Sequence, residues 1–236
     1  MIKKVIIYGA SSLGRLARHY VADGLNMDVI GFVVDDTYKT DNDFDLLPVF
    51  SWSEVEDQFN KDEVLLFVAI GYRSMRLRAK AYENAKSKGF KLINIIANTS
   101  FIAKNVILGD NNFIMPGAVI EPGVRVGSNN VVWSNSTICH DTIVGDHNFV
   151  ASNVTIGGEA CIGNQNFMGF SSVILQNISI GNEVLIAAMS LVIKNTINLS
   201  HYHGAPAIKV KDINSAEGVC VESTSNSDEA ENNQKW

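Results

Sequence analysis

Cysteine, long apolar runs and net positive charge are all scarce in this chain of 236 residues. Its three cysteines, Cys139, Cys161 and Cys220, are too few and too scattered for a disulfide framework or a zinc site, which fits a reducing cytoplasm. No stretch approaches the roughly 18 apolar residues that a membrane-spanning helix needs. The net charge of −6 argues against nucleic acid or an anionic membrane as the main partner. We therefore expect a cytoplasmic protein without membrane insertion.

Metal ligands are equally sparse, since no group of His, Cys and Asp residues has the spacing of a metal site. Hydrophobic residues make up 46% of the chain and charged residues 19%, which suits a soluble protein with a sizeable core. What the chain does contain is a regular repeat, which begins at about residue 100.

Residues 101–196 divide into sixteen consecutive hexapeptides without a gap. The second position of every hexapeptide, from Ile102 to Val192, is aliphatic or Met. Chance would give this about once in 10⁵ tries at such a composition. Three residues later stands a turn position, where Asn fills seven of the sixteen places, Gly two and Asp141 one. Asn and Gly adopt positive φ with the least strain, so these positions indicate tight corners.

A period of six residues fits neither a helix nor a simple alternating hairpin. It predicts a coil with three flat sides, one hexapeptide to each side, whose inward aliphatic residues stack into three columns. Each coil then pairs with the next at the usual strand spacing of about 4.8 Å. An ordinary run of short strands is the alternative. The unbroken register favours a parallel β-helix.

The first hundred residues alternate strand and helix instead. Continuous apolar runs predict buried strands, and amphipathic stretches predict helices at 10–25 and 74–89. Short connections between such elements are typical of a parallel α/β sheet. The polar segment 37–61 is ambiguous, apart from SWSEVEDQF, which favours a helix. The expected strands are Lys3 to Gly9, Met27 to Asp36, Asp62 to Gly71 and Phe90 to Ile96.

Three segments follow from these patterns. We expect an α/β Rossmann-like domain with a short parallel sheet over residues 1–97 and a β-helix over 98–210. Residues 211–236 are rich in Ser, Asn, Glu and Asp and poor in apolar residues, and they predict a disordered polar tail.

Three turns at the carboxyl ends of the expected strands point to one ligand crevice. The first strand runs into GASSLG, from Gly9 through Ser11, and then a helix, whose N-terminal N–H groups can face a pyrophosphate. Asp35 and Asp36 end the second strand, and Gly71 ends the third. Each feature alone is readily structural, as a tight turn or a cap. Together they favour a nucleotide-linked sugar over NAD, because about 100 residues hold only one mononucleotide-binding half.

His140 and Asp141 form a His-Asp pair just after the inward Ile138. Asp141 occupies a turn position, so turn chemistry explains it, whereas no other repeat has His where His140 stands. Neutral imidazole titrates near pH 6.5, so His140 can accept a proton from an attacking amine or hydroxyl. The adjacent carboxylate would fix its tautomer and stabilise the imidazolium. A neutral surface His at a corner is the alternative.

A coil of three hexapeptides places Gly158 one turn above His140. No other Gly-Gly pair occurs in the chain, and an unhindered N–H at Gly158 is a candidate donor to the oxyanion that forms when a nucleophile attacks a carbonyl group. His147 is a second candidate base, without a directly following carboxylate. His201 and His203 lie past the regular repeats, where they either line a ligand groove or cap it.

The motifs occur in one order along the chain: IIYGAS..G, DD after the second strand, AIG....R, GF.LINII, SNSTICHD.IVGD within the hexapeptides, and G.PA. In this order they resemble the hexapeptide-repeat nucleotide-sugar acetyltransferases, of the sialic acid O-acetyltransferase and bacillosamine N-acetyltransferase type, over residues 2 to about 210. The resemblance implies a left-handed β-helix and a homotrimer. It also implies acetyl-coenzyme A as co-substrate, in grooves between neighbouring β-helices, and a nucleotide-linked sugar on the N-terminal domain.

The resemblance also assigns roles by position. His140 matches the general base and Asp141 the acid that follows it. Gly158 matches the backbone donor to the thioester oxygen, and Phe170 and Ala188 fall where the pantetheine runs. The segment at 204–207 matches the one that closes the end of the groove. The positions in the sugar-nucleotide loops are Gly9, Ser11, Asp35, Asp36 and Gly71.

Some positions depart from the family pattern. Ser12 stands where many relatives have Gly, and Asp141 is shorter than the Glu of some members. Phe149 stands where at least one relative has a second active-site His, and Ala97-Asn98 where many have His. These changes leave the reaction class intact and the acceptor open.

Three hypotheses remain. The first is acetyl transfer from acetyl-coenzyme A to the amine of a nucleotide-linked 4-amino-4,6-dideoxy sugar, in surface polysaccharide or glycan synthesis as the resemblance implies. The second is O-acetylation of a sugar hydroxyl such as that of sialic acid. The third, from another class, is a non-catalytic nucleotide-binding scaffold, against which the presence of His140 and Gly158 argues.

Overall fold

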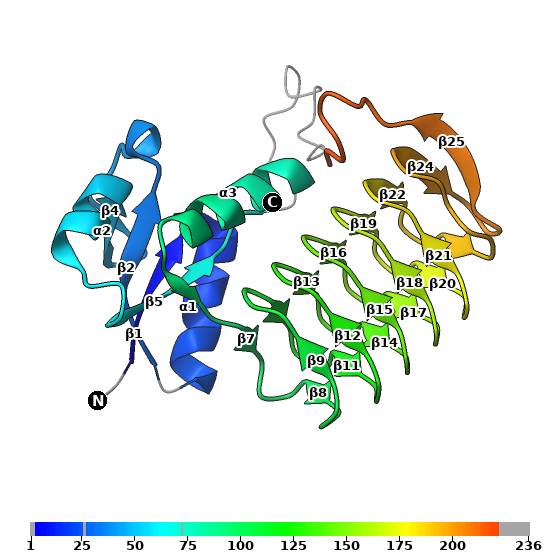
Figure 1. Cartoon of the computed structure of the whole chain (residues 1–236), viewed down its shortest axis with the longest axis horizontal. Coiled ribbons are helices and arrows are strands. Elements are labelled where there is room, and N and C mark those ends of the chain that lie inside the picture. Colours follow the sequence, from blue (N-terminus) through cyan, green and yellow to red (C-terminus); the bar gives the residue numbers. More distant parts are fainter. Residues whose placement is uncertain (1–2, 26, 72, 222–236) are drawn as a thin grey trace, which may run out of the picture.

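The computed structural model describes residues 3–25, 27–71 and 73–221, which form an α/β domain followed by a column of stacked coils (Figure 1). Within these residues a six-stranded sheet has the order β3-β4-β2-β1-β5-β6. All its neighbours pair in parallel except β3 with β4, which confirms the expected parallel α/β domain. The strands are β1 (Lys3–Tyr8), β2 (Met27–Val34), β3 (Asp43–Phe44), β4 (Leu47–Ser51), β5 (Val64–Val68) and β6 (Lys91–Leu92).

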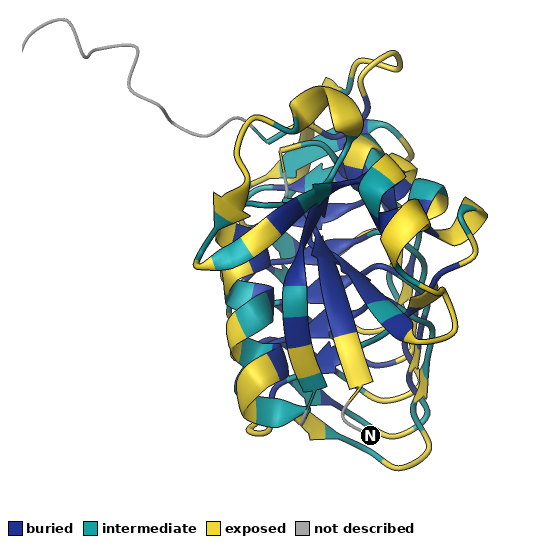
Figure 2. Ribbon diagram, turned by 90° about the vertical axis from the view of Figure 1, so that its left-hand side faces the viewer, coloured by how far each residue is buried: buried dark blue, intermediate teal, exposed yellow. Residues whose placement is uncertain are grey.

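The helices of this domain are α1 (Ser12–Gly24), α2 (Trp52–Gln58), α3 (Met75–Ser87) and the 3₁₀ helix η1 (Asp36–Tyr38). The helix expected within SWSEVEDQF is α2, and it starts with a capping box between Ser51 and Glu54. The hairpin of β3 and β4 was not expected, because a two-residue strand and a Pro-containing one give no clear alternation. Figure 2 shows the sheet buried along most of its length, with exposed residues on the outer sides of the helices.

Three parallel sheets build the coils, and we call them faces 1, 2 and 3. Face 1 contains β7 (Ile95–Ile96), β10 (Phe113–Ile114), β13 (Val131–Val132), β16 (Phe149–Val150), β19 (Phe167–Met168), β22 (Val184–Ile186) and β24 (Ser200–His203), and ends in the antiparallel strand β25 (Ile208–Asp212). Face 2 contains β8 (Phe101–Ile102), β11 (Val119–Ile120), β14 (Thr137–Ile138), β17 (Thr155–Ile156), β20 (Val173–Ile174) and β23 (Leu191–Val192). Face 3 contains β9 (Ile107–Leu108), β12 (Arg125–Val126), β15 (Ile143–Val144), β18 (Cys161–Ile162) and β21 (Ser179–Ile180).

The register repeats every 18 residues, as for the hydrogen bond from Asn130 N–H to Asn112 Oδ1. The three-sided parallel β-helix is therefore confirmed. Its inward positions are buried in every hexapeptide except the first two, at Ile102 and Leu108. These two lie in the first full coil, near the end of the column where the coils begin. The stacked aliphatic columns supply the apolar burial that the short strands cannot supply individually.

Positive φ occurs at fourteen of the sixteen turn positions, without interruption from Asn111 to Met189. Several of these positions carry residues that rarely adopt such a backbone, including Glu159, Gln165 and Met189 itself. The corner geometry of the coil therefore overrides local residue preference, because each corner is fixed by ladder hydrogen bonds to the coils before and after it.

The expected single strand at 90–96 is divided between the two halves of the molecule. β6 pairs with β5 in the α/β sheet, whereas β7 pairs with β10 in face 1. Asn94 lies between them and binds to the β-helix: its side chain donates to Gly109 O and accepts from Asn112 N–H at 2.7 Å each. Asn94 is thus the first member of a ladder of stacked Asn side chains that continues at Asn130.

The α/β domain packs against face 1. The ring of Phe113 on β10 meets that of Phe67 edge-on, with centroids 5.4 Å apart. Arg78 of α3 is 2% exposed and donates hydrogen bonds to Asn129 O (2.8 Å) and to Ile70 O (2.5 Å). Since one guanidinium binds both halves, α3 and the end of β5 are fixed relative to the β-helix.

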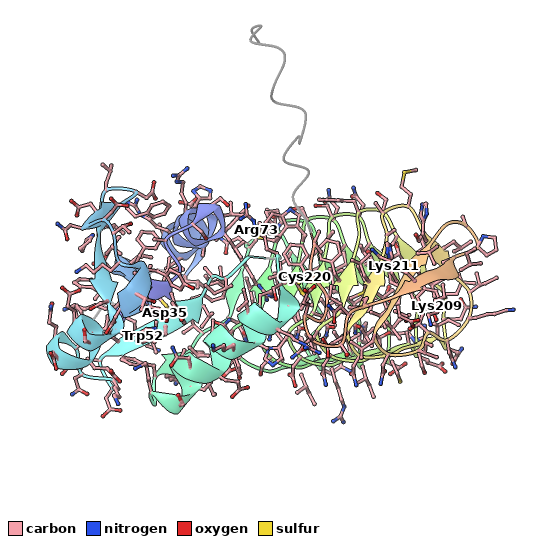
Figure 3. All side chains as sticks on the ribbon, turned by 90° about the horizontal axis from the view of Figure 1, so that it is seen from above. Asp35, Trp52, Arg73, Lys209, Lys211 and Cys220 are labelled. Atoms are coloured by element: carbon pink, nitrogen blue, oxygen red, sulfur yellow. The ribbon has the colours of Figure 1, made fainter. Side chains whose placement is uncertain are left out.

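Residues 213–221, which we call the C-terminal segment, run from β25 back along the coils to α3 (Figure 1). Val219 is fully buried, Met75 N–H donates to Val219 O, and Val221 N–H donates to Arg73 O (both 3.0 Å). Figure 3 accordingly shows Arg73 and Cys220 together at the junction of the two halves. Here the structure differs from the expected disordered tail, because Val219 and Val221 supply apolar anchors. Residues 222–236 of that expected tail lie outside the described residues.

Candidate active site

His140 follows β14 at the corner between faces 2 and 3. Its Nδ1 lies 3.1 Å from Asp141 Oδ2, and its backbone N–H donates to Glu121 Oε2 at 2.7 Å. Asp141 has a φ of 58°, so it does occupy a tight corner, and its carboxylate nevertheless reaches the imidazole. The His140 side chain is 56% exposed. The corner thus presents an oriented imidazole that a substrate can approach.

Gly158 lies one coil along from His140, directly against the imidazole. A Cβ atom on Gly158 would sit 2.7 Å from His140 Cε1 and Nε2, closer than real Cβ atoms come to other heavy atoms. Among the hydrogen bonds of the described residues, none uses Gly158 N–H, whereas the adjacent Gly157 N–H donates to Ile174 O. The structure therefore brings together an imidazole, a carboxylate and a backbone donor that the coil leaves available.

Cys139 is the nearest thiol to this group, and it is not primed as a nucleophile. Burial and the negative charge of Glu121 both raise the pKa of the Cys139 thiol, so that it stays protonated at neutral pH. A neutral thiol is a poor attacking group. General base chemistry at His140 is what the cluster can perform.

The other candidate histidines have different surroundings. His147 packs edge-on against Tyr82, with ring centroids 5.3 Å apart, and its Nδ1 accepts a hydrogen bond from the Asn129 amide at 2.9 Å. Burial lowers the pKa of His147. It therefore serves the contact between α3 and face 1 as a neutral side chain. His201 faces the C-terminal segment, and His203 is exposed at the end of β24.

Phe170 and Ala188 lie one coil apart at the corner between faces 1 and 2, where Met189 N–H donates to Phe170 O at 2.8 Å. Both are exposed, Phe170 by 56%. They share an edge of the prism with each other but not with His140. A single chain therefore does not bring these predicted cofactor-binding positions next to the imidazole.

A cleft lies along the carboxyl ends of β1, β2 and β5, and we call it the sheet-edge cleft. It comprises a first cavity of 890 Å³, reaching Asp35 and Lys80, and a second of 870 Å³, reaching Ser11 and Gly71. The two cavities share the lining residues Gly9, Ile70 and Leu77. The crevice expected at the ends of the parallel strands is thus present.

The predicted substrate-binding residues differ in the space around them and in the hydrogen bonds they already make. Gly9 has a φ of 124°, and a Cβ there would meet Ala69 O at 2.8 Å, so only glycine fits. Ser11 Oγ accepts from Gly14 N–H at 3.4 Å and so caps α1. Gly71 has no heavy atom within 4 Å of its would-be Cβ and faces open space.

The two predicted acidic residues, Asp35 and Asp36, have different surroundings. Tyr8 hydroxyl donates to Asp35 Oδ1 at 2.5 Å, and burial, with the Asp35 carboxylate next, raises the pKa of Tyr8. Asp35 therefore stands in the wall of the first cavity as an acceptor. Asp36 instead accepts from Ser53 N–H at 3.3 Å and does not line either cavity. A cap explains Asp36 without a ligand.

The sequence interpretation missed cleft residues whose importance depends on tertiary contacts. Leu77, Arg73 and Trp133 line the second cavity, and Trp133 comes from the β-helix. Only Trp133 carried a signal, because it is the single Trp among the hexapeptides, at a position where the next coil has Ala151.

Two further properties bear on the site. Among the described residues, no three His, Cys, Asp or Glu side chains are grouped so that they could hold a metal ion. The described helices include none that is both long and apolar enough to cross a bilayer.

Two family models match the chain. Residues 4–85 match the PglD N-terminal domain, and residues 105–140 and 123–158 match the bacterial transferase hexapeptide. No curated protein matches the chain. The resemblance indicated by the motifs is thus confirmed in both halves.

Solved structures share the whole architecture. The acetyltransferase domain of PglB from Neisseria gonorrhoeae, in complex with acetyl coenzyme A, is 21% identical, covers 89% of this chain and 100% of that chain, and has a TM-score of 0.80. A mutant GDP-perosamine N-acetyl transferase from Caulobacter crescentus, in complex with CoA and GDP-perosamine, is 21% identical, with coverages of 90% and 99% and a TM-score of 0.81. WeeI from Acinetobacter baumannii is 19% identical, with coverages of 88% and 100% and a TM-score of 0.74. At these identities the likeness shows the fold.

Proposed function

We propose that this chain, which joins a PglD N-terminal domain to bacterial transferase hexapeptide repeats, transfers an acetyl group from acetyl-coenzyme A to the amine of a nucleotide-linked 4-amino-4,6-dideoxy sugar. The observation that carries the proposal is the packing of the His140 imidazole, held by Asp141, against Gly158. The ligands of the similar structures, acetyl coenzyme A in one and CoA with GDP-perosamine in another, support it.

The geometry suggests how each group acts. Because His140 Nδ1 faces the Asp141 carboxylate, its proton is held there and Nε2 is free to accept a proton. The acceptor nitrogen attacks the thioester carbonyl while Nε2 removes its proton, and the oxyanion that forms accepts a hydrogen bond from Gly158 N–H. The imidazolium then returns a proton to the departing sulfur of coenzyme A, which leaves the acetylated amine.

We infer a homotrimer from the distribution of these groups. The sheet-edge cleft reaches face 1 at Trp133, whereas His140 lies at the far edge of face 2. A cleft on one copy and an imidazole on the next can serve one acceptor if the β-helices pack side by side. Exposed apolar residues on faces 2 and 3 favour such packing: Phe101, Leu175, Ile193, Ile107, Ile143 and Ile197. The proposed setting is polysaccharide synthesis in the cytoplasm.

Coenzyme A release with a panel of acceptors tests the proposal. The panel contains UDP-, dTDP- and GDP-linked 4-amino-4,6-dideoxy sugars and free sialic acid, each with acetyl-coenzyme A. Thiol release with an amino sugar, absent with its 4-hydroxy counterpart, supports N-acetylation. Release with sialic acid alone supports O-acetylation, for which the same imidazole would serve. Nucleotide binding without thiol release from any acceptor supports the scaffold. His140→Ala is the control variant: thiol release that depends on the proposed base should be lost in it.

A further inference from the structure

Trp133 is the only residue of the β-helix among the described residues that line the sheet-edge cleft. It follows β13 on face 1 and is partly exposed, while Val131 and Val132 just before it are buried. In the adjoining coils the same column holds Met115 and Ala151. The cleft therefore has one wall that belongs to the half of the molecule where the chemistry takes place.

The indole of Trp133 is held by its neighbours. It stacks on the ring of Phe149, with centroids 5.7 Å apart and an interplanar angle of 29°, and Phe149 stacks on Phe167 at 5.4 Å and 13°. Phe149 is 4% exposed and Phe167 9%. An aromatic surface fixed in this way contacts a ligand at little cost in side-chain entropy.

The wall around Trp133 is apolar. Leu16, Ile70 and Leu77 line the same cavity, and Leu77 is 59% exposed in the absence of a ligand. No hydrogen bond among the described residues involves the indole N–H of Trp133. The second cavity therefore offers an apolar patch around Trp133, whereas Ser12, Arg73 and Ser74 supply polar groups elsewhere in its lining.

The arrangement of the cleft gives a direction for the acceptor. The N-terminus of α1, where N–H groups favour a diphosphate, lies where the two cavities meet at Gly9. Asp35 and Lys80 supply polar groups in the first cavity, and Asp35 lies on the side of the molecule away from the β-helix (Figure 3). A nucleoside in the first cavity places the sugar in the second, against Trp133.

We propose that Trp133 determines acceptor specificity by packing against the deoxygenated C6 side of the sugar; this inference rests on the proposed function. A C6 methyl group gains contact with the indole and with Leu77. A C6 hydroxyl packed against the face of the indole and against Leu77 loses water without gaining a partner there, which disfavours it by about 10- to 100-fold. The specificity of the transferase is then set partly by its β-helix.

Paired acceptors test the inference. We would measure kcat/KM for a nucleotide-linked 4-amino-4,6-dideoxy sugar and for its 6-hydroxy counterpart, with wild type, Trp133→Ala, Trp133→Phe and Met115→Ala. Wild type should prefer the 6-deoxy acceptor at least tenfold. Trp133→Ala should abolish the preference by losing mainly the 6-deoxy reaction, and Trp133→Phe should keep part of it. Met115→Ala, which removes a buried side chain of the same column outside the cleft, should keep the preference.

A binding measurement separates this inference from the proposed function. Tryptophan fluorescence is titrated with the same two sugars, using Trp133→Phe and Trp52→Phe to assign the signal. A Trp133 response that is stronger for the 6-deoxy sugar supports the inference even if no acetyl transfer occurs. Acetyl transfer with a preference unchanged in Trp133→Ala overturns the inference and leaves the function standing. Absence of both transfer and binding rejects both.

Discussion

The β-helix and the α/β domain reveal their candidate site residues in opposite ways. In the β-helix every position has a fixed direction, inward, outward or at a corner, so a residue with a task appears as an exception to the repeat. His140 and Gly158 are such exceptions, and the coil places them in contact. Regular architecture thus makes candidate site residues recognisable in the sequence.

The α/β domain has no such reference pattern. Its candidate residues all lie at strand ends, where turns, caps and ligands call for the same residue types. In the structure Ser11 and Asp36 accept hydrogen bonds from helix N–H groups, and Asp35, Gly71 and Ser11 itself line the sheet-edge cleft. The difference predicts large effects for substitutions at the exceptions in the β-helix and graded effects in the α/β domain.

His140→Ala should give the largest loss. Removing the base lowers kcat by about 10³-fold, because general base catalysis contributes on that order. The fold and the sheet-edge cleft should be unaffected, since the side chain is exposed at a corner. Steady-state thiol release checks the rate, and circular dichroism with nucleotide titration checks the fold. A rate near that of wild type would contradict the expectation that substitutions at exceptions to the β-helix repeat have the larger effects.

Gly158→Ala should lower kcat by about 100-fold, because its Cβ displaces an imidazole that must be placed within about 1 Å. The matched control is Gly24→Ala, outside the sheet-edge cleft, whose Cβ would come no closer than 3.3 Å to the Asn98 side chain and should leave kcat unchanged. Steady-state kinetics and the melting temperature of both variants separate loss of activity from loss of folding. Equal kinetics in the two variants would contradict the contact with His140.

Asp35→Ala should raise KM for the nucleotide sugar about tenfold, the expected size for one hydrogen bond to a charged group. Asp36→Ala should leave KM unchanged and cost some stability of α2, since its carboxylate accepts from Ser53 N–H. Initial-rate measurements and melting curves distinguish the two. A shared rise in KM would show that both acids face the ligand.

His147 should give the smallest effect, visible only in the pH dependence of stability. Its pKa is lowered by burial, so the unfolded chain binds the proton more readily than the folded chain. Stability from this group is complete above the ordinary pKa near 6.5 and falls as pH drops below it. His147→Asn should flatten the curve of melting temperature between pH 7 and 5. His203→Asn, at an exposed position, should leave the slope unchanged.

The repeat and its corner positions followed from the sequence because each hexapeptide reports the same local geometry. The strands of the α/β sheet also followed, since β1, β2 and β5 are continuous apolar runs. Other features could not follow, because they depend on contacts between distant segments. The anchoring of the C-terminal segment through Val219 and the position of Trp133 in the cleft lining are of this kind. The roles of the predicted site residues remain predictions until the variants are measured.

The C-terminal segment also affects the order in which the molecule can be completed. Val221 N–H donates a hydrogen bond to Arg73 O. Arg73 lines the sheet-edge cleft and precedes Val221 by almost 150 residues in the chain. During synthesis Arg73 therefore lacks this contact until all coils of the β-helix have been made. Contacts of such long range slow folding. The sheet-edge cleft is therefore completed by the C-terminal segment and not by the α/β domain alone.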